Sequence, residues 1–183
     1  MNGHHLILGK LTDFITGETL PDTHDERYRQ MLAELLVNQK GYLKTELTPR
    51  TELTITADDK RAIIKIDLTV SLHDHIVMIV RFGPGSMVTR QRPALAASRL
   101  IAPYQVPVVV VTNGADADVL DGHTGKVIAR GLNNIPTRAE LTKHIAGKPL
   151  KPIAAQRADL ESRIVYAYEV DGSCPCDDTI CKL

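Results

Sequence analysis

The stretch IIKIDLTVSLHDHIVMIVR, residues 63–81, decides the fold class of this chain. Successive side chains of a strand point to opposite faces, and between residues 63 and 70 apolar and polar positions alternate in that manner. After a polar turn at 71–75, residues 76–80 are apolar at every position. A continuous short apolar run is typical of a strand covered on both faces. The stretch therefore predicts two neighbouring strands, the second buried in the middle of a sheet.

The flanking sequence supplies further elements of the same sheet. Residues 51–56 alternate as a third strand would, and a turn at 58–60 joins them to the first. Downstream, the glycines and proline of residues 83–86 break the chain before a small-residue helix expected over 93–101. Residues 108–111 then form another apolar run, predicted to be a buried strand.

Capping signals place the other helices. Thr23 and Glu26 are spaced as a capping box, and the apolar stripe behind them predicts a helix that ends near Gly41. A second box at 137–140 opens a short helix. Apolar residues at four-residue spacing over 160–168 predict a last helix, and residues 6–20 look like an irregular lead-in.

The order of helix, three strands, helix and strand predicts an α/β (α+β) protein. Its sheet would be mixed, with four to six strands and helices on its faces. The predicted core occupies residues 1–147. Residues 148–183 are assigned to an appendage that consists of a linker, a C-terminal helix and a cysteine-containing tail. The core is expected to fold without the cysteine tail.

Composition excludes several classes of protein. Lys and Arg total 22, as do Asp and Glu, so the formal net charge is zero and a polycation that coats nucleic acid is excluded. Aromatic residues make up 4% of the chain and Trp is absent, which disfavours a base-stacking platform. No apolar run reaches the roughly 18 residues that a membrane span needs. With cysteines only near the C-terminus and no disulfide framework for the core, we expect a cytoplasmic protein.

This order of elements, with several residues in it, resembles the nuclease domain of the PD-(D/E)xK fold. The similarity is to the N-terminal domain of type I restriction enzyme R subunits and its small stand-alone relatives. It implies a restriction-endonuclease-like α-β-β-β-α-β core and magnesium-dependent cleavage of DNA. The matching residues are Glu26, Arg29, Lys65-Ile66-Asp67, Met78-Ile79-Val80-Arg81 and Val110-Val111-Thr112-Asn113-Gly114.

In such a site an Asp and a Glu on adjacent strands hold a divalent ion, and a Lys two residues after the Glu steadies the attacking water or the phosphate. Asp67 fits the first position, although it would equally suit a solvated acid or a partner of Lys65. Ile79 stands at the acidic position and Arg81 at that of the Lys. Glu26 would be a relocated carboxylate for Mg²⁺, or else part of the capping box. Asp67, Glu26 and Arg81 are thus the candidate catalytic residues of a degenerate site.

A second feature is a run without acidic residues. Between residues 76 and 115 there is no Asp or Glu, whereas four arginines are present. The planar guanidinium suits phosphate, so this run predicts a nucleic-acid surface unless the arginines pair with acids elsewhere. The four are Arg81, Arg90, Arg92 and Arg99.

The cysteines form a separate cluster in the tail, at Cys174, Cys176 and Cys181. Three thiolates this close together would bind zinc with a fourth ligand from elsewhere. A redox pair and incidental thiols are the alternatives.

Together these features favour a nuclease-fold protein that is catalytically impaired and binds DNA or a protein partner. One alternative is an active Mg²⁺-dependent DNA endonuclease with a relocated carboxylate. The other is an interaction scaffold whose cysteine tail carries a metal or a redox function.

Overall fold

A computed structural model describes residues 7–171, 173 and 180–183 of the protein. Over these residues the main sheet has seven strands in the order β3-β4-β5-β6-β7-β8, with β9 paired to β4. Only β5 and β6 run parallel, so the sheet is mixed, as predicted, and larger than expected. The strands are β3 (Leu47–Ala57), β4 (Lys60–Leu72), β5 (His75–Phe82), β6 (Val108–Thr112), β7 (Ala117–Asp121), β8 (Val127–Arg130) and β9 (Ile180–Lys182).

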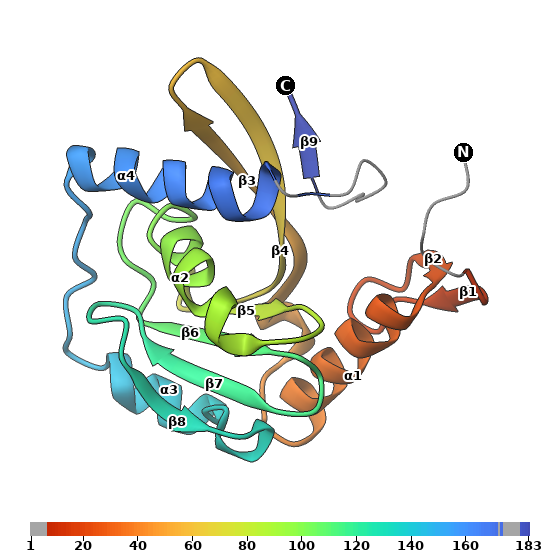
Figure 1. Ribbon diagram of the computed structural model, residues 1–183. Helices are drawn as coiled ribbons and strands as arrows, with labels where there is room; N and C mark the ends of the chain where they lie inside the picture. Colours follow the sequence, from red (N-terminus) through yellow and green to blue (C-terminus); the bar gives the residue numbers. More distant parts are fainter. Residues whose placement is uncertain (1–6, 172, 174–179) are drawn as a thin grey trace.

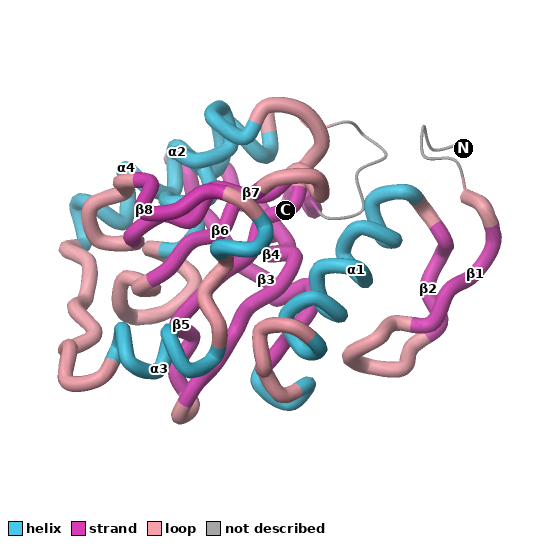
Figure 2. Tube along the Cα trace, turned by 90° about the horizontal axis from the view of Figure 1, so that it is seen from below, coloured by secondary structure: helices cyan, strands magenta, loops and turns pink. Residues whose placement is uncertain are grey.

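Helices cover the sheet on both faces, which gives three layers (Figures 1 and 2). Helices α1 (His24–Asn38) and α3 (Arg138–Ile145) lie on one face. Helices α2 (Met87–Ser98) and α4 (Ala155–Val165) lie on the other, and α4 continues into a π-helical segment, η3 (Tyr166–Val170). The expected α/β architecture with helices on its faces is therefore confirmed.

Strand β6 shows why the predicted apolar runs are buried. All five of its residues are buried, and their side chains alternate between two hydrophobic clusters. Val108 and Val110 belong to the cluster under α1 and α3, whereas Val109 and Val111 belong to the cluster under α2 and α4. Burial of each such side chain stabilises the fold by about 1.5–3 kcal/mol.

Helix α1 begins at the predicted N-cap, but only half of the capping box is present, because the Glu26 side chain contacts Gln30 and Arg29 instead. The side chain of Thr23 accepts a hydrogen bond from the backbone N–H of Glu26, at 3.1 Å. Leu32, Ala33 and Leu36 form its buried face. Gly41, which has a φ of +77°, follows the helix in a backbone conformation that other residues rarely adopt.

Two elements differ from the sequence-based expectation. The lead-in forms a hairpin of β1 (Gly9–Thr12) and β2 (Thr19–Asp22), closed by a turn in which Asp13 accepts from two backbone amides. Helix α2 begins at Met87, six residues before the predicted start at Pro93. The small residues that follow Pro93 suggested the later start, but Pro93 itself lies inside α2.

The C-terminal segment also differs from its assignment as an addition to residues 1–147. Val165, Tyr166 and Val170 are buried in the hydrophobic cluster that includes Ile64 and Ile79. Glu161 of α4 is fully buried, whereas Leu160 and Tyr168, two residues of the predicted apolar stripe, are 52% and 60% exposed. The last helix was predicted correctly, but its buried face was not. Helix α4 is thus part of the main core.

Candidate functional site

The candidate site lies where strand β4 separates from β5. The two strands pair over Leu68–Leu72 of β4, and Asp67 immediately precedes this stretch. Closer to the start of β4, residues Ala62–Ile64 pair with β9. We call the opening between these paired regions the fork; residues 65–67 of β4 and residues 81–82 of β5 line it.

Asp67 closes the ladder of hydrogen bonds at the fork. Its Oδ2 accepts from the backbone N–H of Phe82 at 3.0 Å, and its Oδ1 accepts from Nε of Arg29 at 2.7 Å. Nη1 of Arg81 lies 3.3 Å from Oδ2. The side chain is 5% exposed, so these groups take the place of water around the carboxylate. Asp67 is therefore a buried acid compensated by two arginines and a backbone amide.

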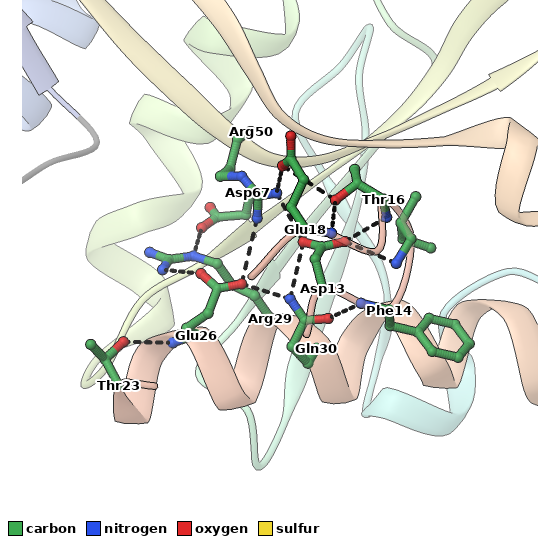
Figure 3. A network of polar contacts seen from close by, with 11 residues as sticks. Asp13, Phe14, Thr16, Glu18, Thr23, Glu26, Arg29, Gln30, Arg50 and Asp67 are labelled. Carbon is green, nitrogen blue, oxygen red and sulfur yellow. Dashed lines mark hydrogen bonds and ion pairs between the residues drawn. The ribbon is translucent and has the colours of Figure 1, made fainter. Parts of the chain in front are cut away.

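Glu26 reaches the same place from α1 (Figure 3). Its Oε2 lies 3.3 Å from Nη1 of Arg29, and its Oε1 accepts from Nε2 of Gln30 at 2.7 Å. The guanidinium of Arg29 therefore lies against both Glu26 and Asp67. Burial acts to lower the pKa of Arg29, but the two carboxylates outweigh burial and raise it. The structure thus brings together Glu26, Asp67 and Arg29, which were singled out from the sequence.

Sequence reasoning missed Asp13 and Arg50, which extend this network toward the β1–β2 turn (Figure 3). Nη2 of Arg50 lies 2.9 Å from Oδ2 of Asp13, and Nη1 lies 3.5 Å from Oε1 of Glu26. Burial raises the pKa of Asp13, but hydrogen bonds from Thr16 and Arg50 outweigh it, so the pKa is lowered. Arg50 adopts a φ of +54° inside β3, which the sequence does not signal.

Arg81 enters the fork from β5. Its Nη1 donates to the carbonyl oxygen of Lys65, and its Nη2 lies 2.9 Å from Oε2 of Glu169 in η3. Burial acts to lower the pKa of Arg81, but the charges of Glu169 and Asp67 raise it. Glu169 was also missed, because nothing in its local sequence connects it to a strand 88 residues earlier.

We call the resulting set of charged residues the fork cluster. Its members are the acids Asp13, Glu26, Asp67 and Glu169 and the arginines Arg29, Arg50 and Arg81. The exposed Glu18, which lies 3.6 Å from Nη2 of Arg50, is not counted among them.

Ile79, at the position where the resemblance requires an acid, contributes no polar group to the fork. Its side chain is fully buried in the hydrophobic cluster under α2 and α4. The pocket against Glu26 and Asp67 has a volume of about 10 Å³, close to the space of one water molecule. In the described part of the chain no group of three or more His, Cys, Asp or Glu residues is arranged to hold a metal. Because guanidinium groups already contact the carboxylate oxygens, these residues do not fit a magnesium ion.

The other arginines of the acid-free run are not gathered at the fork. Arg92 and Arg99 contact Glu161 at 2.6 Å each, and Arg157 of α4 contacts the same carboxylate at 2.6 Å. Burial raises the pKa of Glu161, but hydrogen bonds from the three arginines lower it overall. We call this group the helix clamp, because it ties α4 to α2.

Arg90 lies apart from both clusters, at the start of α2. Its guanidinium packs over Gly83, and its Nη2 donates to the carbonyl oxygen of Pro84 at 3.2 Å. Among the described residues it has no ion pair with an acid. Of the four predicted phosphate contacts, Arg90 is thus the one whose charge is not compensated within this part of the chain.

The predicted cysteine site is placed only in part. Cys174 and Cys176 lie outside the described residues. Cys181 lies in β9, where its thiol is exposed and not in a disulfide. Within the described residues, no helix has the length and apolar character needed to cross a bilayer.

Comparison with models of known protein families gives a match. The model of a family described as the type I restriction enzyme R protein N terminus matches residues 24–136, which is more than half of the chain. The matched stretch contains Glu26, Asp67 and Arg81, and it ends before α4 and Glu169. No curated protein and no solved structure matches.

Proposed function

Because the chain belongs to the family of type I restriction enzyme R protein N termini, we propose that it is a member that binds DNA without cleaving it. The observation that supports the loss of cleavage is the set of contacts around the Asp67 carboxylate. Both of its carboxylate oxygens are in contact with arginines, and one also accepts from the Phe82 amide. Phosphodiester hydrolysis in such a site depends on a well-held metal ion, and a carboxylate engaged in this way is a poor ligand.

A surface beside the fork supports the binding part of the proposal. Tyr28 stacks on Phe82 with ring centroids 5.3 Å apart, and its ring lies against Gly114. Phe82 leads into the glycine loop at 83–86, on which Arg90 packs. We call Tyr28, the glycine loop, Arg90 and Gly114 the loop surface.

The chemistry of the loop surface suits a nucleic-acid backbone. The first turn of α2 contains no acid and Ser86 makes no side-chain cap, so backbone N–H groups remain for an anion. Arg90 adds a positive charge that acids in the described residues do not compensate. Tyr28 is 42% exposed and offers an aromatic ring beside them. The proposal places the protein in the cytoplasm, as its sequence predicts.

Cleavage is tested with the full-length chain and double-stranded DNA in Mg²⁺ or Mn²⁺. We expect no metal-dependent products above the background of the Asp67→Ala variant. Cutting by the unaltered protein that disappears in Asp67→Ala would favour the alternative, an active endonuclease that uses Asp67 and Glu26.

Binding is tested by fluorescence anisotropy of a labelled duplex over about 50–200 mM salt. Arg90→Ala should weaken binding on unrelated sequences alike and reduce the salt slope by about one, since it removes one phosphate contact. Arg157→Ala is the matched control, because it removes an arginine of α4 that belongs to the helix clamp and not to the loop surface. Equal affinity of the Arg90 variant and the unaltered protein would exclude the loop surface. If the unaltered protein itself does not bind DNA, a protein partner is favoured instead.

A further inference from the structure

Arg81 joins the two sides of the fork. Its side chain is 12% exposed and contacts Oδ2 of Asp67 at 3.3 Å and Oε2 of Glu169 at 2.9 Å. It also donates to the carbonyl oxygen of Lys65. One guanidinium thus contacts two carboxylates and a backbone carbonyl, and it holds the segment η3 against strand β4.

This set of oxygens matches the ligands of a hard divalent cation, which takes carboxylate and backbone carbonyl oxygens. The arginine supplies positive charge to the same oxygens through N–H groups. The planar guanidinium of Arg81 presents several N–H groups and can contact two separate carboxylates, whereas a lysine would offer a single point of charge. The positive charge of Arg81 lies between the two carboxylates and offsets their mutual repulsion.

The ligands come from two parts of the chain. Lys65 and Asp67 lie within the stretch that the family model matches, but Glu169 lies beyond it. The C-terminal segment also adds β9 to β4 beside the fork. This segment therefore provides the second carboxylate that position 79 does not.

We propose that Arg81 is a resident cation in place of a divalent metal between Asp67 and Glu169, and that removing its charge converts the fork into a divalent-cation site. The ligands of that site would be the two carboxylates and the carbonyl oxygen of Lys65. The inference deepens the proposed loss of cleavage, since it names the group that stands where a metal would bind. It rests on side-chain contacts and not on DNA binding.

The test is thermal unfolding of the full-length chain, treated first with a chelator and then with Mn²⁺. The melting temperature of the unaltered protein should not change with Mn²⁺. Arg81→Met should melt at a lower temperature in chelator, because Asp67 and Glu169 each lose an arginine contact, although Asp67 keeps Arg29. At roughly tenfold excess of Mn²⁺ over its Kd, this variant should regain about 3–6 °C. If Arg81→Met does not fold in chelator, Arg81→Gln provides a milder variant, because its amide can still donate to one carboxylate.

Two controls make the response specific to the fork. The double variant Arg81→Met with Glu169→Gln lacks one ligand and should not respond to Mn²⁺. Arg99→Met removes a buried arginine from a cluster with a single carboxylate, and it too should not respond. A lack of response in both Arg81 variants would overturn this inference and leave the proposed function standing. Stabilisation of the unaltered chain by Mn²⁺, lost in Asp67→Ala, would instead overturn both.

Discussion

The fork cluster and the helix clamp are both built from arginines around buried or half-buried carboxylates, but their balance of charge is opposite. In the clamp three arginines converge on Glu161, which is fully buried. In the fork four acids share three arginines across β4, α1, η3 and the β1–β2 turn. The clamp has one carboxylate at its centre, whereas the fork has several held close together. The helix clamp therefore joins two helices, whereas the fork cluster has the several neighbouring carboxylates that a cation site needs.

The comparison also separates the predicted phosphate surface into two groups. Arg92 and Arg99 belong to the clamp, and their charge is compensated by an acid from α4. Arg90 is left at the loop surface. Buried ion pairs strongly penalise the loss of one partner, so variants of the two clusters should affect stability, and those of Arg90 should affect binding.

Removing the C-terminal segment should have the largest effect. A chain that ends at Pro152 lacks Glu161 and the buried side chains Val165, Tyr166 and Val170. It should fail to fold, because α2 loses its apolar cover and two arginines lose their acid. A chain that ends at Asp171 keeps all four groups and should lose less than about 3 kcal/mol. Circular dichroism and chemical denaturation of both chains provide the measurement; a folded short chain would restore the separate-tail interpretation.

Glu161→Ala comes next in size. Three arginines would then face one another with no acid between them, and breaking a buried pair in this way costs about 3–5 kcal/mol. The free energy of unfolding from urea denaturation measures the loss. Arg157→Ala, whose side chain is 52% exposed, is the control and should cost less than about 1 kcal/mol. Similar losses in the two variants would mean that Glu161 contributes no more to stability than one exposed arginine of the clamp.

Asp67→Asn tests the fork in the same assay. The amide keeps the shape of the side chain but removes the charge that compensates Arg29 and Arg81. We expect a loss of about 2–3 kcal/mol, smaller than for Glu161→Ala, because Glu26 and Glu169 still compensate the two arginines. A larger loss than that of Glu161→Ala would reverse the order of the two clusters.

Dependence on pH should show the smallest difference. The pKa of Glu161 is lowered from its ordinary value of 4.5, so the unfolded chain takes up the proton first as the pH falls. Its contribution to stability is therefore complete above that value and is lost as the pH falls through the lower pKa of the folded state. Unfolding free energies from about pH 6 to about pH 3 should fall more steeply for the unaltered chain than for Glu161→Gln. Parallel curves would contradict the assignment.

Local sequence predicted most of the elements because their signals are local. The stretch at 63–81 indicated two strands, and the structure has β4 and β5 there. Capping residues placed the starts of α1 and α3, since the Thr23 and Thr137 side chains accept from amides three residues later. Asp67, Glu26 and Arg29 were recognised from their spacing and resemblance, and the fold brings them together.

The remaining site residues were missed because their partners lie far away in the sequence. Glu169 and Arg81 are 88 residues apart, and Glu161 and Arg99 are 62 residues apart. The apolar stripe of the last helix suggested a buried Leu160, but the fold buries Glu161 instead, where three arginines compensate its charge. A periodic pattern shows which side chains are apolar and not which charges will find partners.

The sequence by itself determined the mixed sheet, the capped helices, and the loss of an acid at position 79, because alternation, capping and residue identity act over a few neighbouring positions. Only the tertiary structure decided which arginines are compensated. It placed Glu161 of α4 against Arg92 and Arg99, and it brought Glu169 to Arg81. The four arginines of one acid-free run therefore lie in three different surroundings. The physical reason is that a buried charge is stable only beside an opposite charge, and that neighbour comes from folding and not from the order of residues.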